Sequence, residues 1–290
     1  MRLGLRKAWL FRDTAMLALA LVVGGWCHRA AFADIWGIAH PSEEQSHIFL
    51  APVIAAWLFW LRRSRFRGLS VKASLTGPVI VVLGWLMSWL GYEHGIQVAW
   101  HAGALVSLLG CLVSITGFAL VRLFAPALLA FAFLLPVPGT IRQAIALPLQ
   151  GIATAITQGV LELVGIPAVR MGHVLVINGE HVAVGEACNG MRMVFALVLV
   201  VYAFAFSTPL RTSVRVVLVG LSPLAAIAAN IIRLVPTALF FGYGDPQSAQ
   251  AFHDVAGWVM LPVAFLMLVG LLRLIRWIEL PITPFRLAMP

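Results

Sequence analysis

The chain has 290 residues, of which 61% are hydrophobic and only 11% are charged, and its formal net charge at pH 7 is +9. A soluble globular domain is about 25% charged, so this composition excludes a soluble single domain, a disordered chain and a disulfide scaffold. We predict a polytopic membrane protein, because a bilayer span needs about 20 mostly apolar residues and eight spans use roughly 160.

The hydrophobic stretches, taken in chain order, predict an all-α membrane protein with about eight transmembrane helices. The first follows a basic start and ends in Ala31-Phe32-Ala33, a possible cleavage site of a secretory signal, but the many later spans favour a retained helix. A less apolar segment at 143–165 is expected to lie in the interface or to re-enter the membrane; a full crossing and a short helix pair are the alternatives. The eight predicted spans are 13–33, 46–61, 74–91, 96–121, 123–137, 189–208, 213–241 and 255–277.

Most of the 20 basic residues lie on alternate connections between these spans, which makes that face, with both termini, cytoplasmic by the positive-inside rule. Most acids and the eight histidines fall on or near the opposite face. The positive net charge therefore indicates the orientation of the chain in the membrane. It does not indicate nucleic-acid binding, which would need a basic patch on a soluble surface. The basic residues on the cytoplasmic side are Arg2, Arg6, Lys7, Arg12, Arg62, Arg63, Arg65, Arg67, Lys72, Arg122, Arg211, Arg215, Arg273, Arg276 and Arg286.

The longest connection on the non-cytoplasmic side, about 137–188, carries the only convincing β signal in the chain. Pro136-Val137-Pro138 predicts a helix break at its start. Farther on, 173–177 and 180–184 flank Asn178-Gly179, the pair that supplies the two positive φ angles of a type I′ turn. We expect a β-hairpin here that rests on membrane-embedded helices, because an isolated hairpin is marginal in water.

Cys188 directly follows this hairpin and lies at the N-terminal end of the sixth predicted span. The partial positive charge of a helix N-terminus stabilises a thiolate. Arg192, one turn later, either adds to this effect or pairs with Glu186 or Glu162. A lone cysteine in an apolar protein is usually a packing residue, and the other two cysteines, without polar neighbours, are assigned that role. Three scattered cysteines do not form a disulfide or zinc framework.

Two more polar groups map to the same face of the membrane. Arg233 lies in the seventh predicted span, about 28 Å along the helix from its cytoplasmic start, and a charge within a span marks a functional candidate unless the side chain snorkels. Asn230, one turn earlier, is expected to share its face. His253 is placed in an outer loop before the last span, beside Asp254. A thiol, an imidazole and a fixed cation are the groups that covalent acyl transfer requires.

At these residues the chain resembles the exosortase/archaeosortase family of integral-membrane cysteine transpeptidases. One position departs from the family pattern: Asn189 stands where Ser commonly follows the Cys, which puts the subtype in doubt. The resemblance is strongest from about 131 to 260 and rests on Pro136-Val137-Pro138, Leu149-Gln150, Gly165-Ile166-Pro167, Glu186-Ala187-Cys188-Asn189-Gly190, Asn230-x-x-Arg233 and His253.

The resemblance implies a single exosortase-like domain, 1–290, with N-terminal spans in 1–130 and the catalytic region in 131–277. It implies a bacterial inner-membrane enzyme that cuts C-terminal sorting signals of the Pro-Glu-Pro type, a branch often tied to exopolysaccharide production. Catalysis would fall to Cys188, Arg233 and His253, supported by Asn230, Asn189, Arg192 and Glu186.

The expected partners are the sorting-signal helix of a substrate protein, membrane lipids and an acceptor nucleophile of unknown identity, with no nucleic acid. No cofactor or metal is expected, because the outer histidines lack regular ligand spacing. Two other functions stay open. A transporter would use helices interrupted by proline, as at Ser222-Pro223 and Val235-Pro236. A non-catalytic assembly factor for envelope polymer export would tolerate substitution of Cys188.

Overall fold

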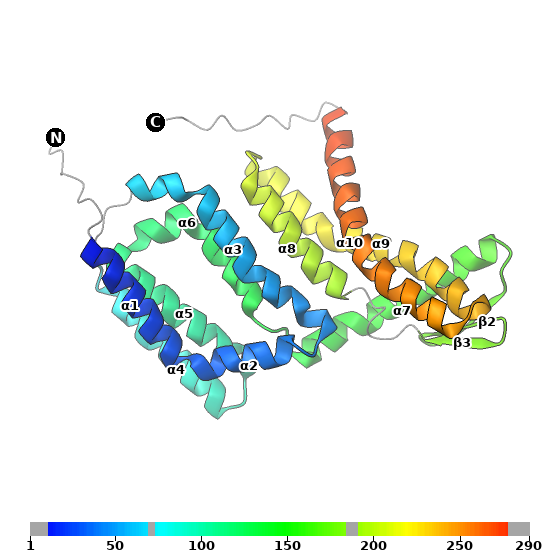
Figure 1. Ribbon diagram of the computed structural model, residues 1–290, viewed down its shortest axis with the longest axis horizontal. Coiled ribbons are helices and arrows are strands. Elements are labelled where there is room, and N and C mark those ends of the chain that lie inside the picture. Colours follow the sequence, from blue (N-terminus) through cyan, green and yellow to red (C-terminus); the bar gives the residue numbers. More distant parts are fainter. Residues whose placement is uncertain (1–10, 69–72, 184–190, 278–290) are drawn as a thin grey trace. The chain divides into compact units, whose positions relative to one another are not determined.

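The computed structural model describes residues 11–68, 73–183 and 191–277. The chain divides into two compact units, Met1–Pro138 and Gly139–Pro290, and each is described by itself. Helices make up most of the described residues, and the one small sheet among them belongs to the second unit (Figure 1).

The first unit is entirely helical in its described part. The first two helices meet at a 67° bend, and Gly117, with φ 63°, separates two later ones. The elements are α1 (Phe11–Cys27), α2 (Arg29–Ala39), η1 (Glu43–Phe49), α3 (Leu50–Leu61), η2 (Arg63–Gly68), α4 (Thr76–Glu93), α5 (Gln97–Thr116), α6 (Phe118–Ala130) and η3 (Phe131–Leu134), the η elements being 3₁₀ helices.

Helices α4 and α5 form the tightest pair of this unit. Gly77, Gly84 and Gly91 recur every seven residues along α4, and a Cβ atom at any of them would collide with the backbone of α5. At Gly84 that Cβ would lie 2.5 Å from the backbone nitrogen of Ser107. Small residues let membrane helices approach closely, so that dispersion contacts replace the hydrophobic effect that lipid does not provide.

The second unit combines one helix, a three-stranded sheet and a three-helix bundle. Pro136-Val137-Pro138 separates η3 from its first helix, as predicted. The elements are α7 (Gly139–Leu163), β1 (Ala168–Met171), β2 (Val174–Ile177), β3 (Glu180–Ala183), α8 (Met191–Ser207), α9 (Thr212–Tyr243) and α10 (Pro246–Trp277).

The predicted hairpin is present as β2 and β3, which pair antiparallel with Ile177 opposite Glu180. Asn178 and Gly179 form the two-residue loop with φ angles of 52° and 84°, as a type I′ turn requires. The structure adds a strand that the sequence did not reveal: β1 pairs antiparallel with β2. Gly172, with φ 66°, begins the turn between them.

The sheet packs on α7 and α9, as expected for a hairpin that cannot stand alone. Leu161 of α7, Leu175 and Ile177 of β2 and Ala238 of α9 are all buried in one hydrophobic cluster. The tip of the hairpin is also tied to the end of α9, because Nδ2 of Asn178 donates to the carbonyl of Gly242 at 3.2 Å. Strand β3, the last element before α8, therefore belongs to a sheet that α7 and α9 hold in place.

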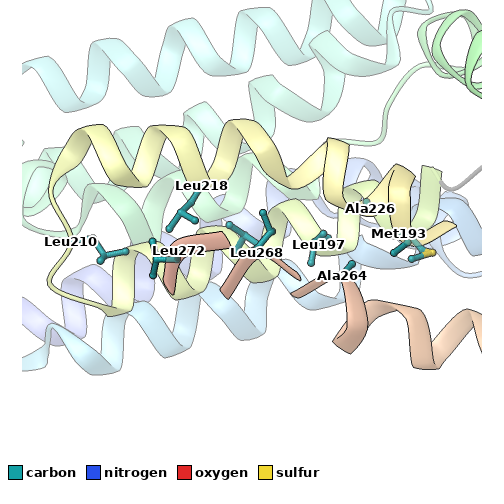
Figure 2. Close-up of a cluster of buried hydrophobic side chains, with 10 residues drawn as sticks. Met193, Leu197, Leu210, Leu218, Ala226, Ala264, Leu268 and Leu272 are labelled. Atoms are coloured by element: carbon teal, nitrogen blue, oxygen red, sulfur yellow. The ribbon is translucent and has the colours of Figure 1, made fainter. Parts of the chain in front are cut away.

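A second hydrophobic cluster joins α8, α9 and α10 (Figure 2). Leu197 of α8 is fully buried, and Ala226 of α9 and Ala264 of α10 leave room for close helix contact. This core fixes the N-terminal end of α8 relative to the two longest helices. The buried members are Met193, Leu197, Val201, Leu210, Leu218, Ala226, Ala229, Ala264, Leu268 and Leu272.

The architecture is that of a predominantly α-helical membrane protein. Among the described residues, four helices are long and apolar enough to cross a bilayer, and the bent pair α1–α2 makes a fifth if it counts as one span. About eight spans therefore stay a prediction, as does the side of the membrane on which the hairpin lies. The four are Gln97–Thr116, Gly139–Leu163, Thr212–Tyr243 and Gln247–Arg273.

The segment predicted to lie in the interface or to re-enter is one continuous helix of 25 residues, α7, with Pro148 inside it. Its length and composition meet the requirement for a span, so the interfacial placement stays a prediction. The helix ends as the sequence indicates. Gly165 adopts φ 82°, and the N–H of Ile166 donates to the carbonyl of Leu161 at 2.9 Å, the pattern of a Schellman cap.

Candidate active site

Arg233 is the most deeply buried cation of the second unit's described part, at 3% exposure within α9. Its Nη2 donates to Oδ1 of Asn230 at 2.9 Å, so the two residues share a helix face as predicted. A snorkelling arginine keeps its head group exposed, and this burial contradicts that alternative. Asn230 is itself 1% exposed, so the pair forms a desolvated polar site inside the three-helix bundle.

Thr237 extends this polar face by one more turn. Its hydroxyl donates to the carbonyl of Arg233 at 2.8 Å, and the side chain is 2% exposed. Thr237 was not among the predicted site residues. The i, i+4 spacing from Arg233, on the same side of α9, is the signal that would have found it.

Arg192 approaches the same place from α8. A Cβ atom built on Gly257 of α10 would lie 2.9 Å from Nη2 of Arg192 and 3.3 Å from Nη1 of Arg233. The two guanidinium groups, 41 positions apart in the chain, thus converge on one glycine. The guanidinium of Arg192 also lies over the ring of Trp258, 5.6 Å from its centroid, which is within the range of a cation–π interaction.

His253 lies in α10, so its predicted position in a loop is wrong. The helix begins at Pro246 because Asp245 caps it: Oδ1 of Asp245 accepts a hydrogen bond from the N–H of Ser248 at 2.9 Å. The side chain and then the N–H of Ser248 hold the pKa of the exposed Asp245 carboxyl below its ordinary value. Gly, Asp and Pro in sequence suggested a loop, yet here they begin a helix.

The imidazole of His253 is largely buried, with 14% of its side chain exposed. Its Nδ1 lies 3.2 Å from Oδ1 of Asp254, which also accepts a hydrogen bond from Gln250 at 3.0 Å. His253 and Asp254 are therefore in contact, which their adjacency in the sequence did not by itself establish. His253 precedes Gly257 by one helical turn, so both face the same side of α10.

Arg192, Arg233 and the His253–Gly257 face of α10 thus come from three helices that share one core. The nucleophile candidate Cys188 and its neighbours Glu186 and Asn189 lie outside the described residues, and their roles stay predictions. Glu162, an alternative partner for Arg192, accepts a hydrogen bond from Gln158 of its own helix at 2.7 Å. No group of three or more His, Cys, Asp or Glu side chains among the described residues could hold a metal ion.

The family model described as transmembrane exosortase matches residues 36–270, which is most of the chain and includes parts of both units. This chain belongs to the transmembrane exosortase family. The resemblance inferred from the sequence motifs is thereby confirmed. No curated protein matches this exosortase, and no solved structure does.

Proposed function

We propose that this exosortase is a cysteine peptidase or transpeptidase that cleaves the C-terminal sorting signals of exported proteins. The observation that carries the proposal is the convergence of Arg192 and Arg233 on the face of α10 that also bears His253. Cys188 precedes Arg192 by four residues in the chain. Family membership supports an exosortase-type role in the membrane.

In the proposed reaction, the Cys188 thiolate attacks the scissile carbonyl, and the resulting C–S bond leads to a thioester. Arg233 stabilises the oxyanion, and loss of one such donor typically costs about 10²–10³ in rate. His253 gives a proton to the leaving amine and afterwards takes one from the acceptor nucleophile. Asn230 supports this chemistry by accepting the hydrogen bond that orients Arg233.

The proposed setting follows from charge and topology. The enzyme would span the bacterial inner membrane with both termini in the cytoplasm and the site on the periplasmic face. The substrate would carry a Pro-Glu-Pro-type motif, an apolar helix and a basic tail, and the product would pass to an acceptor. A link to exopolysaccharide export belongs to the same proposal.

One feature counts against a transporter. Interrupted helices at Pro223 and Pro236 were the sequence argument for it, but α9 runs without a break from Thr212 to Tyr243 and contains both prolines. Broken half-helices, whose termini bind substrate and ions in many transporters, are therefore not formed at these prolines.

The deciding experiment co-expresses the enzyme with a reporter that ends in such a signal and follows reporter size on a gel. Cys188→Ala should abolish processing, and the matched variant Cys111→Ala should process normally. A thioester between Cys188 and the reporter, trapped by acid quench and released by hydroxylamine, would establish the covalent step. Normal processing by Cys188→Ala would exclude this mechanism and favour an assembly factor.

A further inference from the structure

Helix α10 passes the two arginines at Gly257. The Cβ of any other residue at 257 would lie 2.9 Å from Arg192 Nη2, so the flexible end of that arginine would have to move away. By contrast, Gly270 of the same helix has no atom within 4 Å of such a Cβ. At 257, unlike at 270, the absence of a side chain leaves space that the two guanidinium groups approach.

The next residue of α10 acts on the same group from the other direction. The ring of Trp258 lies beneath the guanidinium of Arg192 at 5.6 Å. Gly257 thus admits the guanidinium, and Trp258 supplies an aromatic face that favours its charge. Two adjacent residues of one helix set where Arg192 lies.

Two neighbouring guanidinium groups repel each other, most strongly where burial removes water. An oxyanion that contacts both groups is stabilised by each of them, because each can donate to it in the fork geometry typical of arginine. In thiolate attack on a peptide carbonyl, a C–S bond forms and the π electrons of the C=O bond move to oxygen. The anion therefore appears only in the tetrahedral state; when the C=O bond re-forms, the C–N bond breaks and the amine leaves with the proton of His253.

We propose that Gly257 and Trp258 are positioning residues that hold Arg192 beside Arg233, so that two guanidinium groups stabilise the oxyanion of the tetrahedral intermediate. This inference rests on the proposed function and deepens it: Arg192 becomes a catalytic residue for the substrate carbonyl oxygen. The site is then selective for a charge that develops during the reaction.

The test uses the full-length exosortase in proteoliposomes with a reporter that carries a Pro-Glu-Pro motif, an apolar helix and a basic tail. Single-turnover rates are measured over a range of reporter-to-lipid ratios, which separates the maximal rate from apparent affinity. Gly257→Ala should lower the maximal rate at least about tenfold and Arg192→Ala by about 10²-fold, both with little change in affinity. Trp258→Leu should lower it about two- to fivefold, and Gly270→Ala should match the wild type.

The double variant Gly257→Ala/Arg192→Ala separates positioning from general damage. If Gly257 acts through Arg192, the double variant should be no slower than Arg192→Ala alone, because the methyl group then has no guanidinium to displace. The inference would be overturned if the rate effects of the two single variants multiply in the double variant. A wild-type rate for Gly257→Ala, or a change in affinity alone, would overturn it as well. An inactive Cys188→Ala beside a fully active Gly257→Ala would refute this inference and leave the proposed function standing; an active Cys188→Ala would refute both.

Discussion

Arg233 donates a 2.9 Å hydrogen bond from Nη2 to the side-chain oxygen of Asn230, one turn earlier in α9, and both side chains are almost completely buried. A buried guanidinium needs fixed acceptors, because the cost of an unpaired charge in a dry site is several kcal/mol. Asn230 therefore sets the direction in which Arg233 presents its remaining N–H groups. This relationship makes the arginine a rigid donor.

Arg233→Lys should lower processing of the reporter by about 10²–10³-fold, because an ammonium cannot reproduce the planar fork of the guanidinium. The rate is measured by pulse-chase of the reporter in cells. Arg211→Lys, an exposed arginine at the start of α9, serves as the matched control and should be silent. Equal rates for Arg233→Lys and the wild type would exclude a role for guanidinium geometry.

His253→Gln should slow cleavage of a peptide bond by about 10²–10⁴-fold, the usual contribution of a positioned acid or base. If His253 protonates the leaving amine, a reporter peptide with an ester at the scissile position should lose much less, since an alcohol leaves more easily. The exposed His173 provides the control as His173→Gln. A loss of the same size on amide and ester would argue against the acid role.

Gly242→Ala should loosen the hairpin from α9. Its Cβ would lie 2.6 Å from Cγ2 of Ile177, and overpacking of this kind costs about 1–3 kcal/mol. Hydrogen exchange in β2 and β3 should speed up, and processing should fall because β3 leads toward Cys188. Gly220→Ala on the same helix, with no atom within 4 Å of its Cβ, should leave exchange unchanged. Normal protection in Gly242→Ala would show that the hairpin is held elsewhere.

The cap of α10 should depend on pH through Asp245. The pKa of its carboxyl is lowered by Ser248 in the folded state, so the cap's contribution is complete above the ordinary carboxyl pKa and is lost as the pH falls through the lowered value. Protection factors in the first turn of α10 should therefore fall as the pH drops below about 4, the ordinary pKa of an aspartate. Asp245→Asn keeps a capping oxygen and should show no such pH dependence; the same fall in this variant would contradict the assignment.

Features encoded by neighbouring residues were predictable, and those set by distant packing were not. Asn178-Gly179 fixes its turn through its own φ angles, and Asn230 and Arg233 share a face by spacing alone. His253 was misplaced because Gly244-Asp245 resembles a loop signal until the capping bond of Asp245 is seen. Nothing in the sequence around Gly257 distinguishes it from Gly270, because its importance lies in the arginines opposite it.

The glycines between α4 and α5 prevent another helix from entering between these two helices. The backbones of these helices touch at Gly77, Gly84 and Gly91, whereas a helix with its side chains is about 10–12 Å wide. A third helix could enter between them only if α4 and α5 separated along their whole length. If the proposed sorting-signal helix enters from the lipid, it would have to pass elsewhere than between α4 and α5, because close contact along their whole length leaves no opening between these two helices.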